Sequence, residues 1–138
     1  MTPGQLTDAY LAALQAADET RVLALFARGA IVHSPLYGPV PAAEFYPALF
    51  RDTTRASLTL RGVTSGTSPA GAPLVGLWFH FAWRLGDGRD APFDVVDMLE
   101  LDPDGLIAAL HIIYDTVDVR PAFEASTGHP SWRPGVPS

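Results

Sequence analysis

The order of two hydrophobic patterns constrains this chain more than any other feature: helical spacing comes first and strand-like alternation follows. Over residues 5–18, apolar side chains recur at steps of three and four, which predicts a helix with one buried stripe. A second helix is expected to begin at Asp18, placed as an N-cap, and to stop at Gly29. Residues 30–33 predict a short strand, and 41–51 a third helix.

The remainder of the chain has the alternation of strands, bounded by turn residues. Strands are expected over 57–64, 74–85, 91–101 and 106–114, with a hairpin loop at 65–71 and a turn at 102–105. Helices followed by an antiparallel meander predict an α+β domain, with three N-terminal helices packed on one face of a mostly antiparallel sheet.

Length and composition exclude several classes of protein. The 138 residues suffice for one domain, expected over 1–118, and the Pro/Gly-rich tail 119–138 is predicted to be a loose covering segment. The absence of cysteine excludes zinc ribbons and disulfide scaffolds. All 9 basic side chains are scattered arginines, so no nucleic-acid partner is expected. Apolar stretches are too short to cross a membrane, and a cytoplasmic protein is expected.

One carboxylate stands on an apolar strand face. In the strand 91–101, Asp97 has the same parity as Phe93, Val95 and Leu99. An ionised carboxylate there must be paired or hydrated in a pocket, and otherwise it is protonated with a raised pKa. A bulge near Pro92 that turns Asp97 outward is the alternative. The first interpretation makes Asp97 a candidate functional residue.

Tyr10 poses the same question on the first helix. It lies on the buried stripe, so its hydroxyl needs a partner inside the protein. A purely structural tyrosine is the alternative.

The strand 74–85 places Phe79, Phe81 and Trp83 on one face and Trp78 and His80 on the other. An exposed tryptophan predicts that a second copy of the chain covers the outer sheet face. A catalytic role for His80 is the alternative. The other histidines share no helical spacing that would bring two onto one turn, so no metal site is expected.

The placement of these residues resembles a known superfamily. Residues 10–18 and 24–27 are similar to the opening helices of the nuclear-transport-factor-2-like (NTF2-like) superfamily, in particular its ketosteroid isomerase-like and SnoaL-like members. Ile-Val-His-Ser-Pro at 31–35 resembles the strand that follows, and 96–115 resembles the final hairpin. The resemblance spans residues 5–115 and implies a cone-shaped domain that encloses an apolar pocket.

The resemblance also implies roles for individual residues. Tyr10 and a protonated Asp97 would donate hydrogen bonds to an enolate oxygen. Ser34 stands where the superfamily's proton-shuttling aspartate is expected, and a serine hydroxyl is no carboxylate base. The base would then be His33, Asp115 or a water held by Ser34, although His33 points to the opposite side of an ideal strand.

The sequence therefore predicts a pocket for a small apolar ligand, without a cofactor or metal. One hypothesis is an isomerase or cyclase that stabilises the oxyanion of a steroid- or polyketide-like substrate. The other is a non-catalytic binding or sensing module that has lost its base. The residues expected to line the pocket are Phe26, Phe45, Leu58, Phe79, Phe81, Trp83, Phe93, Val95, Leu110, Ile112 and Tyr114.

Overall fold

The computed structural model describes residues 1–135 and has the α+β architecture that the sequence predicts. Its elements, in chain order, are α1 (Pro3–Gln15), α2 (Glu19–Leu23), β1 (Phe26–Ser34), β2 (Gly38–Pro41), α3 (Ala42–Arg51), β3 (Thr53–Thr67), β4 (Pro73–Leu85), β5 (Phe93–Leu101), β6 (Ile107–Ile113) and α4 (Val119–Thr127).

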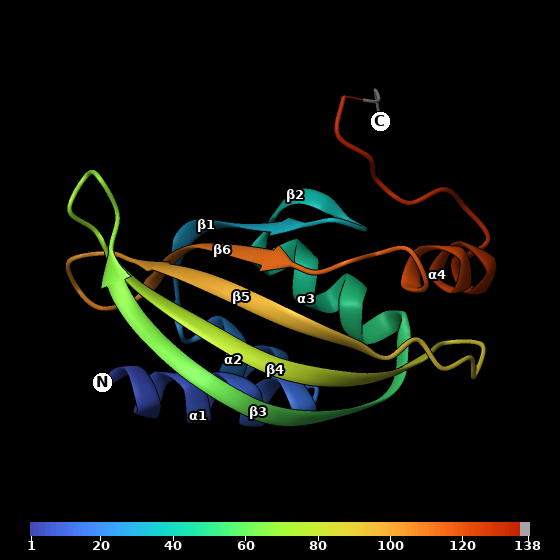
Figure 1. The fold of residues 1–138 in the computed structure, drawn as a ribbon, viewed down its shortest axis with the longest axis horizontal. Coiled ribbons are helices and arrows are strands. Elements are labelled where there is room, and N and C mark those ends of the chain that lie inside the picture. Colours follow the sequence, from blue (N-terminus) through green and yellow to red (C-terminus); the bar gives the residue numbers. More distant parts are fainter. Residues whose placement is uncertain (136–138) are drawn as a thin grey trace.

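The six strands form one sheet in the order β2-β1-β6-β5-β4-β3. Every neighbouring pair is antiparallel except β1 and β6, which run parallel, so the predicted mostly antiparallel sheet is confirmed. The long strands β3 and β4 bend across the molecule, and the N-terminal helices pack against the sheet (Figure 1). The odd-numbered residues of β4 from Val75 to Leu85 are buried in this layer, as the alternation predicted.

Local side-chain bonds explain where the first helices begin. Thr2 and Gln5 form a reciprocal capping box on α1, and the Asp18 side chain accepts a hydrogen bond from the Arg21 N–H at 3.1 Å. The predicted stop of the second helix at Gly29 is wrong, because α2 ends at Leu23 and Phe26 already pairs with Ile107 of β6. Gly29 lies where the β1–β6 register shifts, with a φ of 77° that favours glycine.

The expectation of three helices is correct only for the N-terminal half, because a fourth helix, α4, follows the sheet. The predicted loose tail is helical over Val119–Thr127. Val119 and Phe123 are buried at helical spacing, and Pro121 lies in the first turn, where a missing N–H costs nothing. The last three residues of that predicted tail, 136–138, lie outside the described part of the chain.

A single cluster of buried apolar side chains joins the helices to the sheet. Within residues 1–135, no helix combines the length and the apolar character needed to cross a membrane.

Candidate functional site

The candidate site is a cavity between the inner face of the sheet and helices α1 and α3. It has a volume of about 50 Å³. Its lining is mostly aromatic and aliphatic, and consists of Tyr10, Leu14, Ser34, Leu36, Tyr37, Phe45, Leu49, Phe79, Phe81, Trp83, Phe93, Val95, Asp97, Ile112 and Tyr114.

Asp97 is the one carboxylate in that lining, and β5 directs it inward. Its strand partners are Leu77 of β4 and Ile112 of β6. The residue is 2% exposed, and no residue within 1–135 offers a hydrogen bond to its Oδ1 atom. Burial raises the pKa of Asp97 from 3.8 to about 8, and interaction with the Tyr10 hydroxyl offsets part of that rise. The alternative of a bulge that turns Asp97 outward is wrong.

The hydroxyl groups of Tyr10 and Tyr46 form a buried pair beside Asp97. Their oxygens are 2.8 Å apart, and either hydroxyl can be the donor. Burial raises the pKa of both tyrosines, so both stay protonated at neutral pH. Tyr46 was missed by the sequence analysis, although it follows Ala42 by four residues and precedes Leu49 by three on the buried face of α3.

Ser34 lies at the cavity wall, but turn bonds occupy its hydroxyl oxygen. Ser34 Oγ accepts hydrogen bonds from the N–H groups of Leu36 and Tyr37, both at 3.1 Å. These bonds shape the turn between β1 and β2, so Ser34 has a clear structural role there.

The other two candidate bases, His33 and Asp115, lie away from the cavity. His33 is exposed on the outer sheet face, where its ring stacks on His111 with centroids 4.3 Å apart. Partial desolvation of the ring and the neighbouring His111 lower the pKa of His33. Asp115 is exposed after β6, and its Oδ1 accepts a bond from the Val117 N–H at 3.0 Å.

Most of the residues predicted to line the pocket do line the cavity, and three lie elsewhere. Phe26 packs in the core between Tyr10 and Tyr46, with ring centroids 6.4 and 5.4 Å away. Leu58 packs on the edge of the core from β3, and Leu110 is fully buried against other apolar side chains. The cavity residues that the sequence analysis missed are Leu14, Leu36, Tyr37 and Leu49.

Tyr37 links the cavity to a second carboxylate. Its hydroxyl donates a hydrogen bond of 2.8 Å to Asp52 Oδ2. The Asp52 side chain is only 15% exposed, so this carboxylate is largely shielded from solvent. Burial and the bond to Asp52 raise the pKa of Tyr37.

The outer sheet face also carries Trp78 and His80 of β4. Trp78 is 52% exposed there. His80 Nδ1 lies 3.1 Å from Asp94 Oδ1, so this histidine is on the opposite side of the sheet from the cavity. Within residues 1–135, no group of three or more His, Asp or Glu side chains is arranged to hold a metal ion. The stacked pair of His33 and His111 arises from β1–β6 pairing, which no helical spacing could reveal.

Comparison with solved structures identifies the fold. An NTF2-like protein from an Exiguobacterium species superimposes with a TM-score of 0.65 at 19% identity, over 80% of this chain and 98% of that one. The chain has the NTF2-like fold. Neither a protein-family model nor a curated protein matches the sequence.

Other NTF2-like neighbours have names that refer to enzymes. A candidate polyketide cyclase from Pseudomonas putida has a TM-score of 0.62 at 19% identity, over 86% of this chain and 96% of that chain. AclR, described as a candidate hydroxylase from Streptomyces galilaeus, has a TM-score of 0.69 at 12% identity, over 99% of this chain and 85% of that one. At these identities the likeness establishes the NTF2-like fold alone, because this scaffold supports unrelated activities.

Proposed function

We propose that this NTF2-like protein is an enzyme of the isomerase or cyclase type that stabilises the enolate oxygen of a small cyclic substrate. The observation that carries the proposal is Asp97 Oδ1, a buried carboxyl oxygen without a partner within residues 1–135, in the wall of an apolar cavity. A buried polar atom without a partner costs free energy that a ligand hydrogen bond would recover.

A neutral Asp97 can serve as a hydrogen-bond donor at pH 7. Its pKa of about 8 keeps the carboxyl protonated there. When a base removes the proton next to a substrate carbonyl, the C–H electron pair forms a C=C bond and the carbonyl π pair moves onto the oxygen. The Asp97 O–H, with the Tyr10 hydroxyl beside it, would donate to that oxygen. A well-placed donor in a dry site contributes about 3 kcal/mol of transition-state stabilisation.

The proposed base is Asp52, acting through Tyr37. Among residues 1–135, Asp52 is the carboxylate that is hydrogen-bonded to a hydroxyl in the cavity wall. In this relay Tyr37 accepts the substrate proton as it passes its own proton to Asp52. The proton then returns by the same path to another carbon of the enolate, which isomerises the substrate.

Deuterium exchange next to a carbonyl tests this proposal. We expect the protein to accelerate exchange into 2-cyclohexenone above the buffer rate. Asp97→Asn keeps a neutral donor and should retain part of the acceleration, whereas Asp97→Ala should abolish it. Tyr37→Phe should abolish the exchange and leave ligand binding intact. Equal exchange with and without the protein, across 2-cyclohexenone and a steroid enone, would count against proton-transfer catalysis.

A non-catalytic binding or sensing module is the second candidate function. The observation that favours it is that, among residues 1–135, Asp97 is the one carboxylate in the cavity wall, so no carboxylate base of this part of the chain lines the cavity. This candidate predicts that phenol or 2-cyclohexenone raises the melting temperature without any accelerated exchange.

We also propose that the outer sheet face pairs with a second copy of the chain. Trp78 and Ile113 are 52% and 58% exposed there. Large apolar side chains on one sheet face are stabilised when a symmetric partner covers them.

A further inference from the structure

The small size of the cavity means that any ring-shaped ligand needs part of its wall to move. An engineered protein cavity of about 150 Å³ is large enough to hold benzene. The cavity beside Asp97 measures about 50 Å³, which is enough for a few waters. Entry of a ring-shaped ligand therefore requires part of the wall to open.

A second hollow adjoins the cavity at the ends of β1 and β6. This groove, of about 360 Å³, shares Ser34 and Ile112 with the cavity. Paired residues of β1 and β6 extend only as far as His33 and His111, so Ser34 and Ile112 lie just beyond the last pair. Ser34 and Ile112 therefore form part of the wall between the groove and the cavity.

Arg120 of α4 bridges the two chain segments that leave those strands. Its Nη2 donates to the Pro35 carbonyl at 3.0 Å, next to the end of β1. Its Nε reaches Thr116 Oγ1, in the segment that follows β6, at 3.4 Å. One guanidinium thus ties together two segments that are far apart in the sequence, and Pro35 precedes Arg120 by 85 residues.

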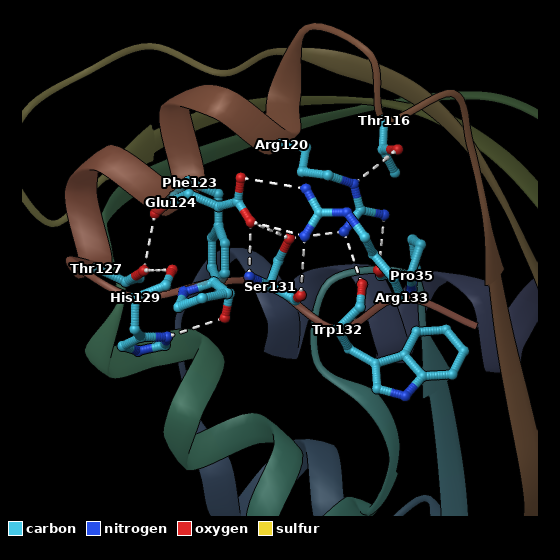
Figure 2. Close-up of polar contacts among 11 residues, drawn as sticks. Pro35, Thr116, Arg120, Phe123, Glu124, Thr127, His129, Ser131, Trp132 and Arg133 are labelled. Atoms are coloured by element: carbon cyan, nitrogen blue, oxygen red, sulfur yellow. Dashed lines mark hydrogen bonds and ion pairs between the residues drawn. The ribbon is translucent and has the colours of Figure 1, made fainter. Parts of the chain in front are cut away.

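The same guanidinium also holds the C-terminal segment that follows α4. Arg120 Nη1 donates to Ser131 Oγ at 2.6 Å and to the Trp132 carbonyl at 2.7 Å (Figure 2). The Trp132 N–H in turn bonds to the Leu36 carbonyl at 2.9 Å, and the Trp132 ring lines the groove. Glu124 secures this segment by accepting bonds from the Ser131 N–H at 2.8 Å and from Arg133 at 3.1 Å.

The helix that carries Arg120 also backs the cavity wall. Phe123 is buried and packs on Tyr37 and Trp83, with ring centroids 5.2 and 5.8 Å away. Both partners line the cavity, so a shift of α4 would free two of its wall residues.

We propose that Arg120 is the size-selecting residue of this site: its bridge from α4 to Pro35 and Trp132 closes an entrance between the ends of β1 and β6. A ligand would pass from the outer groove between Ser34 and Ile112 to reach Asp97. Arg120 acts through the segments that it holds and is a positioning residue. The ligand's identity rests on the proposed function, whereas closure of the entrance does not.

Thiol labelling tests the closure directly, because the chain contains no cysteine. Val95→Cys places a thiol in the cavity wall, and Leu99→Cys places one on the same buried face of β5, outside the cavity. Each variant is labelled with methyl methanethiosulfonate and with a bulkier aromatic methanethiosulfonate, with and without Arg120→Ala.

Arg120→Ala should raise the Val95→Cys labelling rate about tenfold or more, because bonds to a charged donor are lost. The gain should be larger for the bulky reagent, and Leu99→Cys should stay slow. Arg120→Lys should restore part of the protection, since it keeps one charged donor. Unchanged Val95→Cys labelling in folded Arg120→Ala protein would overturn the proposal, as would equal acceleration at Leu99→Cys, which reports general loosening.

Ser131→Ala provides a second test if Arg120→Ala does not fold. It removes one acceptor of the bridge and should accelerate Val95→Cys labelling by about threefold, again without change at Leu99→Cys. No change at Val95→Cys would contradict the proposal.

The closure and the proposed catalysis fail in distinguishable ways. If both are correct, Arg120→Ala should increase exchange into a steroid enone relative to 2-cyclohexenone. Accelerated labelling without exchange into either ketone would support the entrance and refute the enzyme. Exchange with unchanged labelling would refute the entrance alone.

Discussion

The hydroxyl oxygens of Tyr10 on α1 and Tyr46 on α3 lie 2.8 Å apart in the core, beside the buried carboxyl of Asp97. Each hydroxyl supplies the partner that burial of the other requires. The pair therefore orients Tyr10 toward the cavity without an ionised group.

This pairing predicts a non-additive mutant cycle. Tyr10→Phe or Tyr46→Phe leaves one buried hydroxyl without its partner and should each lower the free energy of unfolding by about 1–2 kcal/mol. The double variant removes both hydroxyls, so its loss of unfolding free energy should be smaller than the sum of the two single losses. Urea unfolding of the four proteins measures the cycle, and strictly additive losses would contradict the pairing.

The raised pKa of Asp97 predicts how stability depends on pH. The folded carboxyl has a pKa of about 8 against 3.8 when unfolded, so folding takes up a proton between these values. Asp97 contributes its full stabilisation below pH 3.8, and this contribution to the free energy of unfolding is lost as the pH rises toward about 8. The loss amounts to about 1.4 kcal/mol per pH unit.

Asp97→Asn removes this titration and should flatten the dependence of unfolding free energy on pH. The variant should therefore gain stability relative to the wild type as the pH rises from acid to neutral. Urea unfolding across that range provides the measurement. Parallel pH curves for the two proteins would show that Asp97 does not titrate as the structure indicates.

Gly38 allows the C-terminal segment to pack closely. Its φ of 80° favours glycine, and an added Cβ would lie 2.7 Å from Trp132 Cδ1. Gly38→Ala should lower the free energy of unfolding by about 1 kcal/mol or more and should displace the Trp132 ring. Amide exchange at the Trp132 N–H, which bonds to the Leu36 carbonyl, should accelerate.

Gly66→Ala is the matched control for that variant. An added Cβ at Gly66 meets no atom within 4 Å, so exchange at Trp132 should not change. Equal exchange in the wild type and Gly38→Ala would mean that Trp132 is not held against this glycine.

The proposed pairing of the outer faces predicts a dimer in solution. Trp78→Glu introduces a charge into that face and should shift the protein to a monomer in sedimentation equilibrium. Ala12→Glu, at an exposed position of α1, should leave the dimer intact. A wild-type monomer at micromolar concentration would contradict the pairing.

The sequence predicted those parts of the site that depend on local parity. Asp97 and Tyr10 were found because each breaks an apolar pattern within one element. Tyr46 was not predicted, because helical spacing marks a buried face but does not show which residue of another helix its hydroxyl meets. The pair of His33 and His111 depends on two parallel strands far apart in sequence, which no local period reveals.

The C-terminal helix was missed for a different reason. Pro121 and the glycines nearby favour a loop, but Val119, Ala122 and Phe123 have helical spacing, and tertiary packing of Phe123 stabilises the helix. Arg120 could not be assigned a role from the sequence, because all but one of its acceptors lie more than ten residues away.

The protonation state of Asp97 is the central claim, and carbon-13 NMR of its side-chain carboxyl tests it most directly. Spectra of labelled wild-type protein, with Asp97→Asn to assign the signal, are recorded across the pH range. The structure predicts a carboxyl that is protonated at pH 7 and titrates near 8. A midpoint close to 3.8, the ordinary value, would contradict the neutral donor on which the proposed function depends.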